Sequence, residues 1–161
     1  MLKIVKKITT PILLPYWWQD VLVTLPRIIC GWLLAFDFGA AKFGMPWSPA
    51  EKNLGFGEVA FWFPQDVAEY GGIFALFPVF FAWMGAFSEA VGGIALLLGF
   101  QTRIFSFLIT CTMLVAIFMQ QLPNGMWNAL PAAGFLWIGI WHCIVGSGRI
   151  GIDYFISKNK K

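Results

Sequence analysis

Hydrophobic positions along the chain gather into four long runs, separated by segments rich in polar residues, glycine and proline. The runs cover about residues 21–44, 71–100, 104–122 and 129–145. A helix needs roughly 20 apolar residues to cross a bilayer core, and each run approaches or exceeds that length. Open sheet edges are not tolerated in lipid, and four spans cannot close a β-barrel, so all four are predicted to be helical. The pattern predicts an all-α, integral membrane four-helix bundle, with Pro26 and Pro78 kinking the first two helices.

The segments outside these runs have their own patterns. Residues 1–20 combine three lysines with apolar positions and end in Tyr16-Trp17-Trp18, which predicts a segment lying in the membrane interface. Residues 45–70 are rich in glycine, proline and aromatic residues, and predict an extended aromatic outer segment between the first two helices. Residues 21–155 would form the membrane domain, followed by a basic tail at 156–161.

The loop charges predict the orientation. Three lysines precede the first run, Arg103 lies between the second and third, and four basic residues follow the fourth. The segment after the first run holds four acidic residues and only Lys52, and the loop after the third run is uncharged. Basic residues favour the cytoplasmic side, so both termini are expected in the cytoplasm.

Composition supports a membrane protein. Of 161 residues, 59% are hydrophobic and 12% are charged. A soluble domain typically has about 45–50% apolar and about 25% charged residues. The net charge of +3 comes largely from the two ends, so it reads as a topology signal and not as a nucleic-acid footprint. The expected surroundings are a lipid bilayer and other membrane protein subunits.

Glu89 is the most informative residue, because it is a lone carboxyl within an otherwise apolar run of 30 residues. Such a group costs roughly 2.5–3.5 kcal/mol at the centre of a membrane helix on insertion scales, so a functional position is the default expectation. Gly92 and other small residues surround it and predict that it faces a neighbouring helix. Internal packing of charges without chemistry is the alternative.

Rise per residue gives depths for the other charges. Glu89 lies about 15 Å and Arg27 about 9 Å from the inner ends of their helices, so the two are predicted to pair. The expected cavity is lined by Glu89, Arg27 and residues around Gly92, and opens toward Arg103. Asp37 lies higher, at about 24 Å, and is expected to face the outer mouth.

Other chemistries have little support in the sequence. The three cysteines fall on different predicted helices without paired spacing, which argues against a disulfide or a redox pair. His142 is the only histidine, so a haem held by two histidines of one chain is excluded. No pattern indicates a nucleotide or a metal.

Several stretches together resemble the DoxX family of small four-helix membrane proteins. The first lies in the first helix, as Pro26-Arg27 through Gly31 and then Phe38-Gly39-Ala40-Ala41-Lys42-Phe43. The others are Ser88-Glu89-Ala90-Val91-Gly92-Gly93, Leu98-Gly99-Phe100-Gln101-Thr102-Arg103, Leu122-Pro123-Asn124-Gly125, and Gly146-Ser147-Gly148-Arg149 with Asp153. The resemblance covers roughly residues 22–155.

The resemblance implies a multi-pass protein of the bacterial inner membrane, similar to the large subunit of thiosulfate:quinone oxidoreductase. It favours a quinone-linked redox subunit, in which Glu89 accepts a proton and Arg27 holds its charge. Arg103, Gly92 and Asp37 would contribute to the quinone site. A non-catalytic accessory subunit of a larger membrane complex remains the alternative.

Overall fold

The computed structural model describes residues 10–158, and in this part of the chain four helices are long and apolar enough to cross a membrane. The first joins α2 (Trp17–Trp32) to the π-helical segment η1 (Leu33–Gly39). The second is α5 (Pro78–Leu98). The third joins α6 (Thr102–Val115) to the π-helical η3 (Ala116–Gln121) and the short η4 (Leu122–Asn124), and the fourth is α7 (Met126–Val145). The predicted all-α membrane bundle is confirmed.

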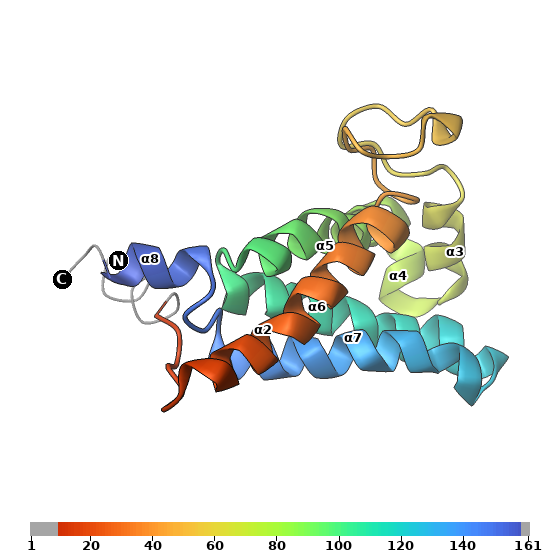
Figure 1. Ribbon diagram of the computed structural model, residues 1–161. Coiled ribbons are helices and arrows are strands. Elements are labelled where there is room, and N and C mark those ends of the chain that lie inside the picture. Colours follow the sequence, from red (N-terminus) through yellow and green to blue (C-terminus); the bar gives the residue numbers. More distant parts are fainter. Residues whose placement is uncertain (1–9, 159–161) are drawn as a thin grey trace.

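In the arrangement of the helices, α5, α6 and α7 lie alongside one another and α2 crosses them obliquely (Figure 1). The short helices α3 (Phe63–Glu69) and α4 (Gly72–Leu76) lie at one end, which we call the loop end. The other end holds the start of α2, the end of α7 and the short helix α8 (Ile152–Lys158), and we call it the terminal end. That the terminal end faces the cytoplasm stays a prediction from the loop charges.

Small residues allow α2–η1 and α5 to pack with their backbones in contact. A Cβ atom added at Gly31 would lie 2.7 Å from the backbone nitrogen of Leu97, and one at Gly39 would lie 2.5 Å from Cα of Ala90. The approach is mutual, because a Cβ at Gly93 would lie 2.7 Å from the nitrogen of Ala35. Close approach of this kind is how membrane helices gain packing energy without a hydrophobic driving force between them.

Several of the predicted helix boundaries were wrong. The first helix begins at Trp17, within the predicted interfacial segment 1–20, and residues 1–9 of that segment lie outside the described residues. The first helix ends at Gly39 and not near residue 44. The second run is divided, because α4 ends at Leu76 and Phe77 breaks the helical geometry before α5 begins at Pro78. Proline has no N–H to donate, and the first helical position needs none, so Pro78 starts a helix instead of kinking one. Pro26 does lie inside α2.

The outer segment folds as a lobe that returns to its starting point. Within the described residues no strand forms, but Phe43 and Val59 make an isolated antiparallel bridge, and the N–H of Ala60 donates to the carbonyl of Lys42 at 2.9 Å. Gly44 closes the lobe, since a Cβ there would overlap the carbonyl oxygen of Gly55 at 1.8 Å. The lobe therefore holds the backbone around Lys42 in place.

Candidate functional site

The central feature of the site is an ion pair between Lys42 and Glu89. Lys42 Nζ lies 2.7 Å from Oε2 and 3.0 Å from Oε1 of Glu89, and donates to both. The Glu89 side chain is 5% exposed and the Lys42 side chain 20% exposed. This cation offsets the penalty of placing the Glu89 carboxylate inside a membrane bundle.

Lys42 reaches Glu89 because the first helix ends early. After Gly39 the chain turns, with the N–H groups of Lys42 and Phe43 both bonded to the carbonyl of Gly39. Gly39 itself lies against Ala90, one residue beyond Glu89, so the turn places Lys42 beside the carboxylate. The Lys42 ammonium also lies 5.1 Å from the ring centroid of Phe63, an arrangement that favours a cation–π attraction.

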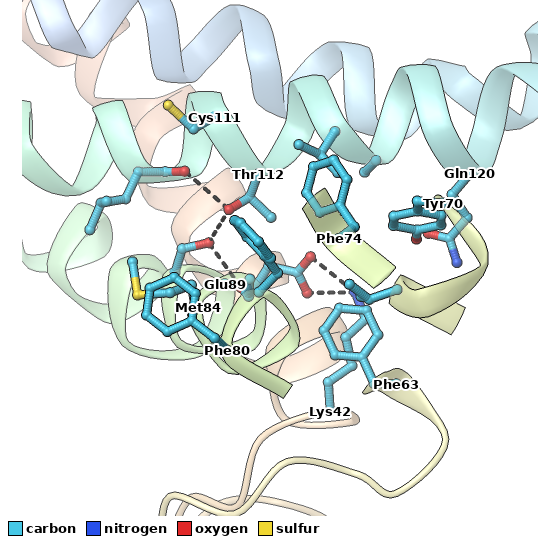
Figure 2. Close-up of a pocket in the computed structure, with 17 residues that line it drawn as sticks. Lys42, Phe63, Tyr70, Phe74, Phe80, Met84, Glu89, Cys111, Thr112 and Gln120 are labelled. Atoms are coloured by element: carbon cyan, nitrogen blue, oxygen red, sulfur yellow. Dashed lines mark hydrogen bonds and ion pairs between the residues drawn. The ribbon is translucent and has the colours of Figure 1, made fainter. Parts of the chain in front are cut away.

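A cavity of about 280 Å³, the aromatic cavity, opens on one side of the ion pair. It lies between α3, α4, α5 and the third helix, and Figure 2 shows Phe63, Phe74 and Phe80 around the pair. Its walls are mostly apolar, and its polar groups are few: Lys42, Tyr70, Ser88, Glu89, Thr112 and Gln120. The hydroxyls of Ser88 and Thr112 lie 2.6 Å apart and join α5 to α6.

Tyr70 adds a hydrogen-bond donor to the rim of this cavity. Burial, with smaller contributions from the charges of Asp66, Glu89 and Glu69, raises the pKa of Tyr70 to about 12. Its phenol therefore keeps its proton at neutral pH and can donate to a bound acceptor.

A second cavity of about 140 Å³, the glutamine cavity, lies on the other side of the same ion pair. It is enclosed by η1, α5, η3 and α7, and Gln120, Gln121 and Asn128 supply its polar wall toward the loop end. Lys42, Glu89, Ala116 and Gln120 line both cavities. The ion pair therefore separates an aromatic space from a partly polar one.

Both π-helical segments of the bundle lie beside this site. The chain leaves η1 at Gly39, three residues before Lys42, and η3 provides Ala116 and Gln120. A π-helical turn changes the direction in which later side chains point and occurs frequently at functional sites.

Arg27 belongs to a different cluster, at the terminal end. It is 1% exposed and donates to the backbone carbonyls of Leu96 and Ile150, both at 2.5 Å. Leu96 is seven residues from Glu89 along α5, which corresponds to about 10 Å. The predicted Arg27–Glu89 pair is therefore wrong, since Arg27 ties α2 to the end of α5 and to the segment before α8.

Two carboxylates complete the terminal-end cluster. Asp153 accepts the backbone N–H of Gln101 at 2.8 Å and that of Thr102 at 2.9 Å, so α8 caps the start of α6. Asp20, in the first turn of α2, pairs with Arg149. Two of the family-like stretches, Leu98–Arg103 and Gly146–Arg149 with Asp153, therefore have a structural role. Their contacts hold this end of the bundle together.

The predicted cavity was placed at the wrong end. Glu89 lines the cavities, but Arg27, Gly92 and Arg103 line neither. Gly92 packs against α6, where an added Cβ would meet the side chains of Ile109 and Phe105 at 3.5 Å. Arg103 donates to the carbonyl of Ile144 at 3.0 Å, near the terminal end.

Asp37 lies apart from the ion pair. It is exposed and lines a surface groove between η1 and α7, not the mouth of the Glu89 cavity. The thiols of Cys30, Cys111 and Cys143 are free and lie on three different helices. Within residues 10–158, no group of three or more histidine, cysteine, aspartate or glutamate side chains is placed to hold a metal ion.

Lys42 is the residue that the sequence analysis missed. A first helix that continued to residue 44 would keep Lys42 within its last turn, beyond Asp37 and away from Glu89. One signal could have identified it: the family-like stretch Phe38-Gly39-Ala40-Ala41-Lys42-Phe43 places glycine, a common helix terminator, before the lysine.

Comparison with known proteins gives one match. No curated protein and no solved structure matches the chain. The DoxX family model matches residues 22–122, which is more than half of the chain and includes most of α2, all of α5 and α6, and both residues of the ion pair. This multi-pass membrane protein therefore belongs to the DoxX family.

Proposed function

We propose that this protein is a quinone-linked redox subunit that binds a quinone head group in the aromatic cavity, against the Lys42–Glu89 pair. The observation that carries the proposal is an ion pair inside the bundle that borders two cavities of different character. The proposal places the protein in a bacterial inner membrane, with its terminal end in the cytoplasm.

The residues of the aromatic cavity fit this kind of molecule. Its volume of about 280 Å³ is close to the lower end of the range for small-molecule pockets, about 300–1,000 Å³. Phenylalanine rings suit a flat apolar ring, and the donors at one side suit carbonyl oxygens. Lys42 Nζ, the Tyr70 phenol and the Gln120 amide are three of the donors that line the cavity.

A bound quinone would supply chemistry that takes up two electrons and two protons. The chain's own part would be to orient the carbonyl oxygens and to handle protons. Lys42 Nζ would donate to a carbonyl oxygen, and the Glu89 carboxylate would take up and release a proton. The phenylalanine walls would keep bulk water away from the ring. An electron-transferring partner protein would exchange the electrons.

The glutamine cavity offers a route for protons to Glu89. Its volume of about 140 Å³ has room for several water molecules, at roughly 30 Å³ each. Gln120, Gln121 and Asn128 provide the polar partners that ordered water requires, and they extend toward the loop end. Water there would connect the Glu89 carboxylate to the loop side of the membrane.

The test replaces Glu89 by glutamine, which removes the charge and keeps the shape. Membranes from the native host would be assayed for quinone-linked electron transfer, and protein purified in mild detergent would be analysed for bound quinone by its ultraviolet spectrum. We expect Glu89→Gln to lower electron transfer by about 100-fold or more, the usual effect of losing a general acid or base. Glu51→Gln is the matched control, because Glu51 is exposed in η2 (Ala50–Lys52).

The same experiment decides between the two functions. If Glu89→Gln folds and electron transfer is unchanged, Glu89 only packs the bundle. The protein is then better described as a non-catalytic accessory subunit of a larger membrane complex.

A further inference from the structure

Asp37 is a carboxylate on the outer surface of the bundle. It lies on η1 and is exposed, and its side chain has no hydrogen-bonding or ionic partner among the residues that the structure describes. The other carboxylates of the bundle have partners: Glu89 has Lys42, Asp20 has Arg149, and Asp153 has the start of α6. Asp37 is therefore the exception to a consistent pattern.

The neighbours of Asp37 place it near the middle of the bundle. The Phe38 ring lies 5.4 Å from the ring of Phe135, which is close to the midpoint of α7, about 14 Å from its start and about 15 Å from its end. Gly39 lies against Ala90, which is about 12 Å from the end of α5. Asp37 directly precedes Phe38, so these contacts place it about level with the middle of α7, inside the first membrane-spanning helix (Trp17–Gly39).

A carboxylate at this depth needs a partner. Charged residues within membrane spans almost always face the bundle interior or a water-filled cavity, or pair with another charge. Asp37 lies on an outer face that lipid would cover in the isolated chain. Its sequence neighbour Phe38 is also 41% exposed, which confirms that this face is turned outward.

The surface around Asp37 has the shape of a docking groove. The groove runs between η1 and α7, and its remaining lining is almost wholly apolar: Cys30, Leu33, Phe38, Leu130, Pro131, Gly134 and Phe135. At Gly134 an added Cβ would meet no atom within 4 Å, so a neighbouring backbone could approach closely there.

We propose that this groove docks a transmembrane helix of a different membrane protein, and that this helix carries a lysine or arginine that pairs with Asp37. The charge of Asp37 and its depth determine the chemistry of the partner. The proposal does not rest on quinone binding, because the groove includes neither Lys42 nor Glu89.

A second copy of this chain fits the groove poorly. Within the described residues, the basic side chains in or beside the spans already have partners. Lys42 is bound to Glu89, Arg27 to backbone carbonyls and Arg149 to Asp20. A symmetric dimer through this face would bring two unpaired Asp37 carboxylates together, and like charges repel most strongly where water is absent. A different polypeptide is therefore the expected occupant.

Photo-crosslinking in native membranes tests the proposal. Benzoylphenylalanine would replace Phe38, which lines the groove. In a matched control it would replace Phe118, which is 61% exposed on η3 and lines neither the groove nor either of the two cavities. We expect position 38, but not position 118, to capture a discrete protein. Mass spectrometry should place the captured peptide in an apolar segment that contains lysine or arginine.

Asp37→Asn supplies the second arm. This near-isosteric variant should accumulate in the membrane at the normal level, because Asp37 makes no contact that folding needs. The crosslink from position 38 should fall by more than about tenfold, since removing one partner of a buried charge pair weakens binding strongly. Exchanging the charges, with Asp37→Lys and an acidic residue in the partner helix, should restore it.

Three outcomes would overturn the proposal. They are capture of lipid alone, capture of a second copy of this chain, and an unchanged crosslink in Asp37→Asn. None of them affects the quinone assay of Glu89→Gln, so the two proposals fail separately.

Discussion

The two ends of the bundle use buried charge in opposite ways. At the terminal end, Arg27 donates to backbone carbonyls of two other segments, and Asp153 caps the start of α6. At the loop end, Lys42 and Glu89 bind one another and border two cavities. One cluster fills its space with hydrogen bonds to the backbone, and the other leaves space around an ion pair.

This difference separates structural charge from candidate chemistry. Arg27 joins two other segments through Nη1 and Nη2, so it cannot release these donors to a ligand without opening the fold. A lysine and a carboxylate that satisfy each other beside a cavity can exchange partners, because a ligand's oxygen or a proton can replace one of the two. The terminal end therefore holds the helices together, and the loop end is the place to look for function.

The largest effect is expected from Arg27→Met, which tests the structural half of the comparison. The change removes the two hydrogen bonds that the guanidinium donates to the carbonyls of Leu96 and Ile150. A hydrogen bond from a charged group contributes about 1.5–3 kcal/mol, so the free energy of unfolding in detergent should fall by about 3–6 kcal/mol. Lys52→Met, at an exposed position, is the control and should change little. A stability equal to that of the control would show that Arg27 does not tie the helices.

A smaller loss of stability, which a second substitution should largely reverse, is expected at the ion pair. Lys42→Met leaves Glu89 buried without its cation and should lower the free energy of unfolding by about 3 kcal/mol, the low end for breaking a buried pair. Adding Glu89→Leu should recover most of this loss, because replacing both partners by apolar groups is often neutral. Chemical unfolding of the two single variants and the double variant measures the coupling. Additive losses would contradict the pairing.

The sequence predicted the bundle well because hydrophobic length and loop charge are local properties. The four helices follow from the runs of apolar residues. The importance of Glu89 follows from the free-energy cost of a lone carboxyl in lipid. The partner of Glu89 was not predictable in the same way. Depth counted along an ideal helix placed Arg27 nearby, but the early end at Gly39 and the oblique crossing of α2 moved Lys42 to the carboxylate instead.

The role of Arg27 depended on groups that a sequence pattern does not display. Its partners are backbone carbonyls, and every residue has one, so nothing in the pattern distinguishes Leu96 and Ile150 as acceptors. The aromatic cavity was hidden for a related reason. Its walls combine the third helix and α5 with α3 and α4. The helix α3 lies in an outer segment whose fold was not predicted beyond its aromatic character, and α4 was predicted as part of the second membrane helix.

The smallest effect is expected from adding one sulfur atom, which tests whether the glutamine cavity holds water. Ala132 lines the glutamine cavity. Ala133, the next residue on α7, is exposed on the outer face and lines neither of the two cavities nor the groove. In a background without the native cysteines, Ala132→Cys should react with a small, charged methanethiosulfonate reagent and Ala133→Cys should not. The thiolate is the reactive form, and it forms in water and not in lipid. Neither variant should alter stability by much, because one atom is added at each position.

Equal protection of both thiols would mean that the glutamine cavity is dry. The proposed proton route to Glu89 would then have to be abandoned, even if quinone still bound in the aromatic cavity.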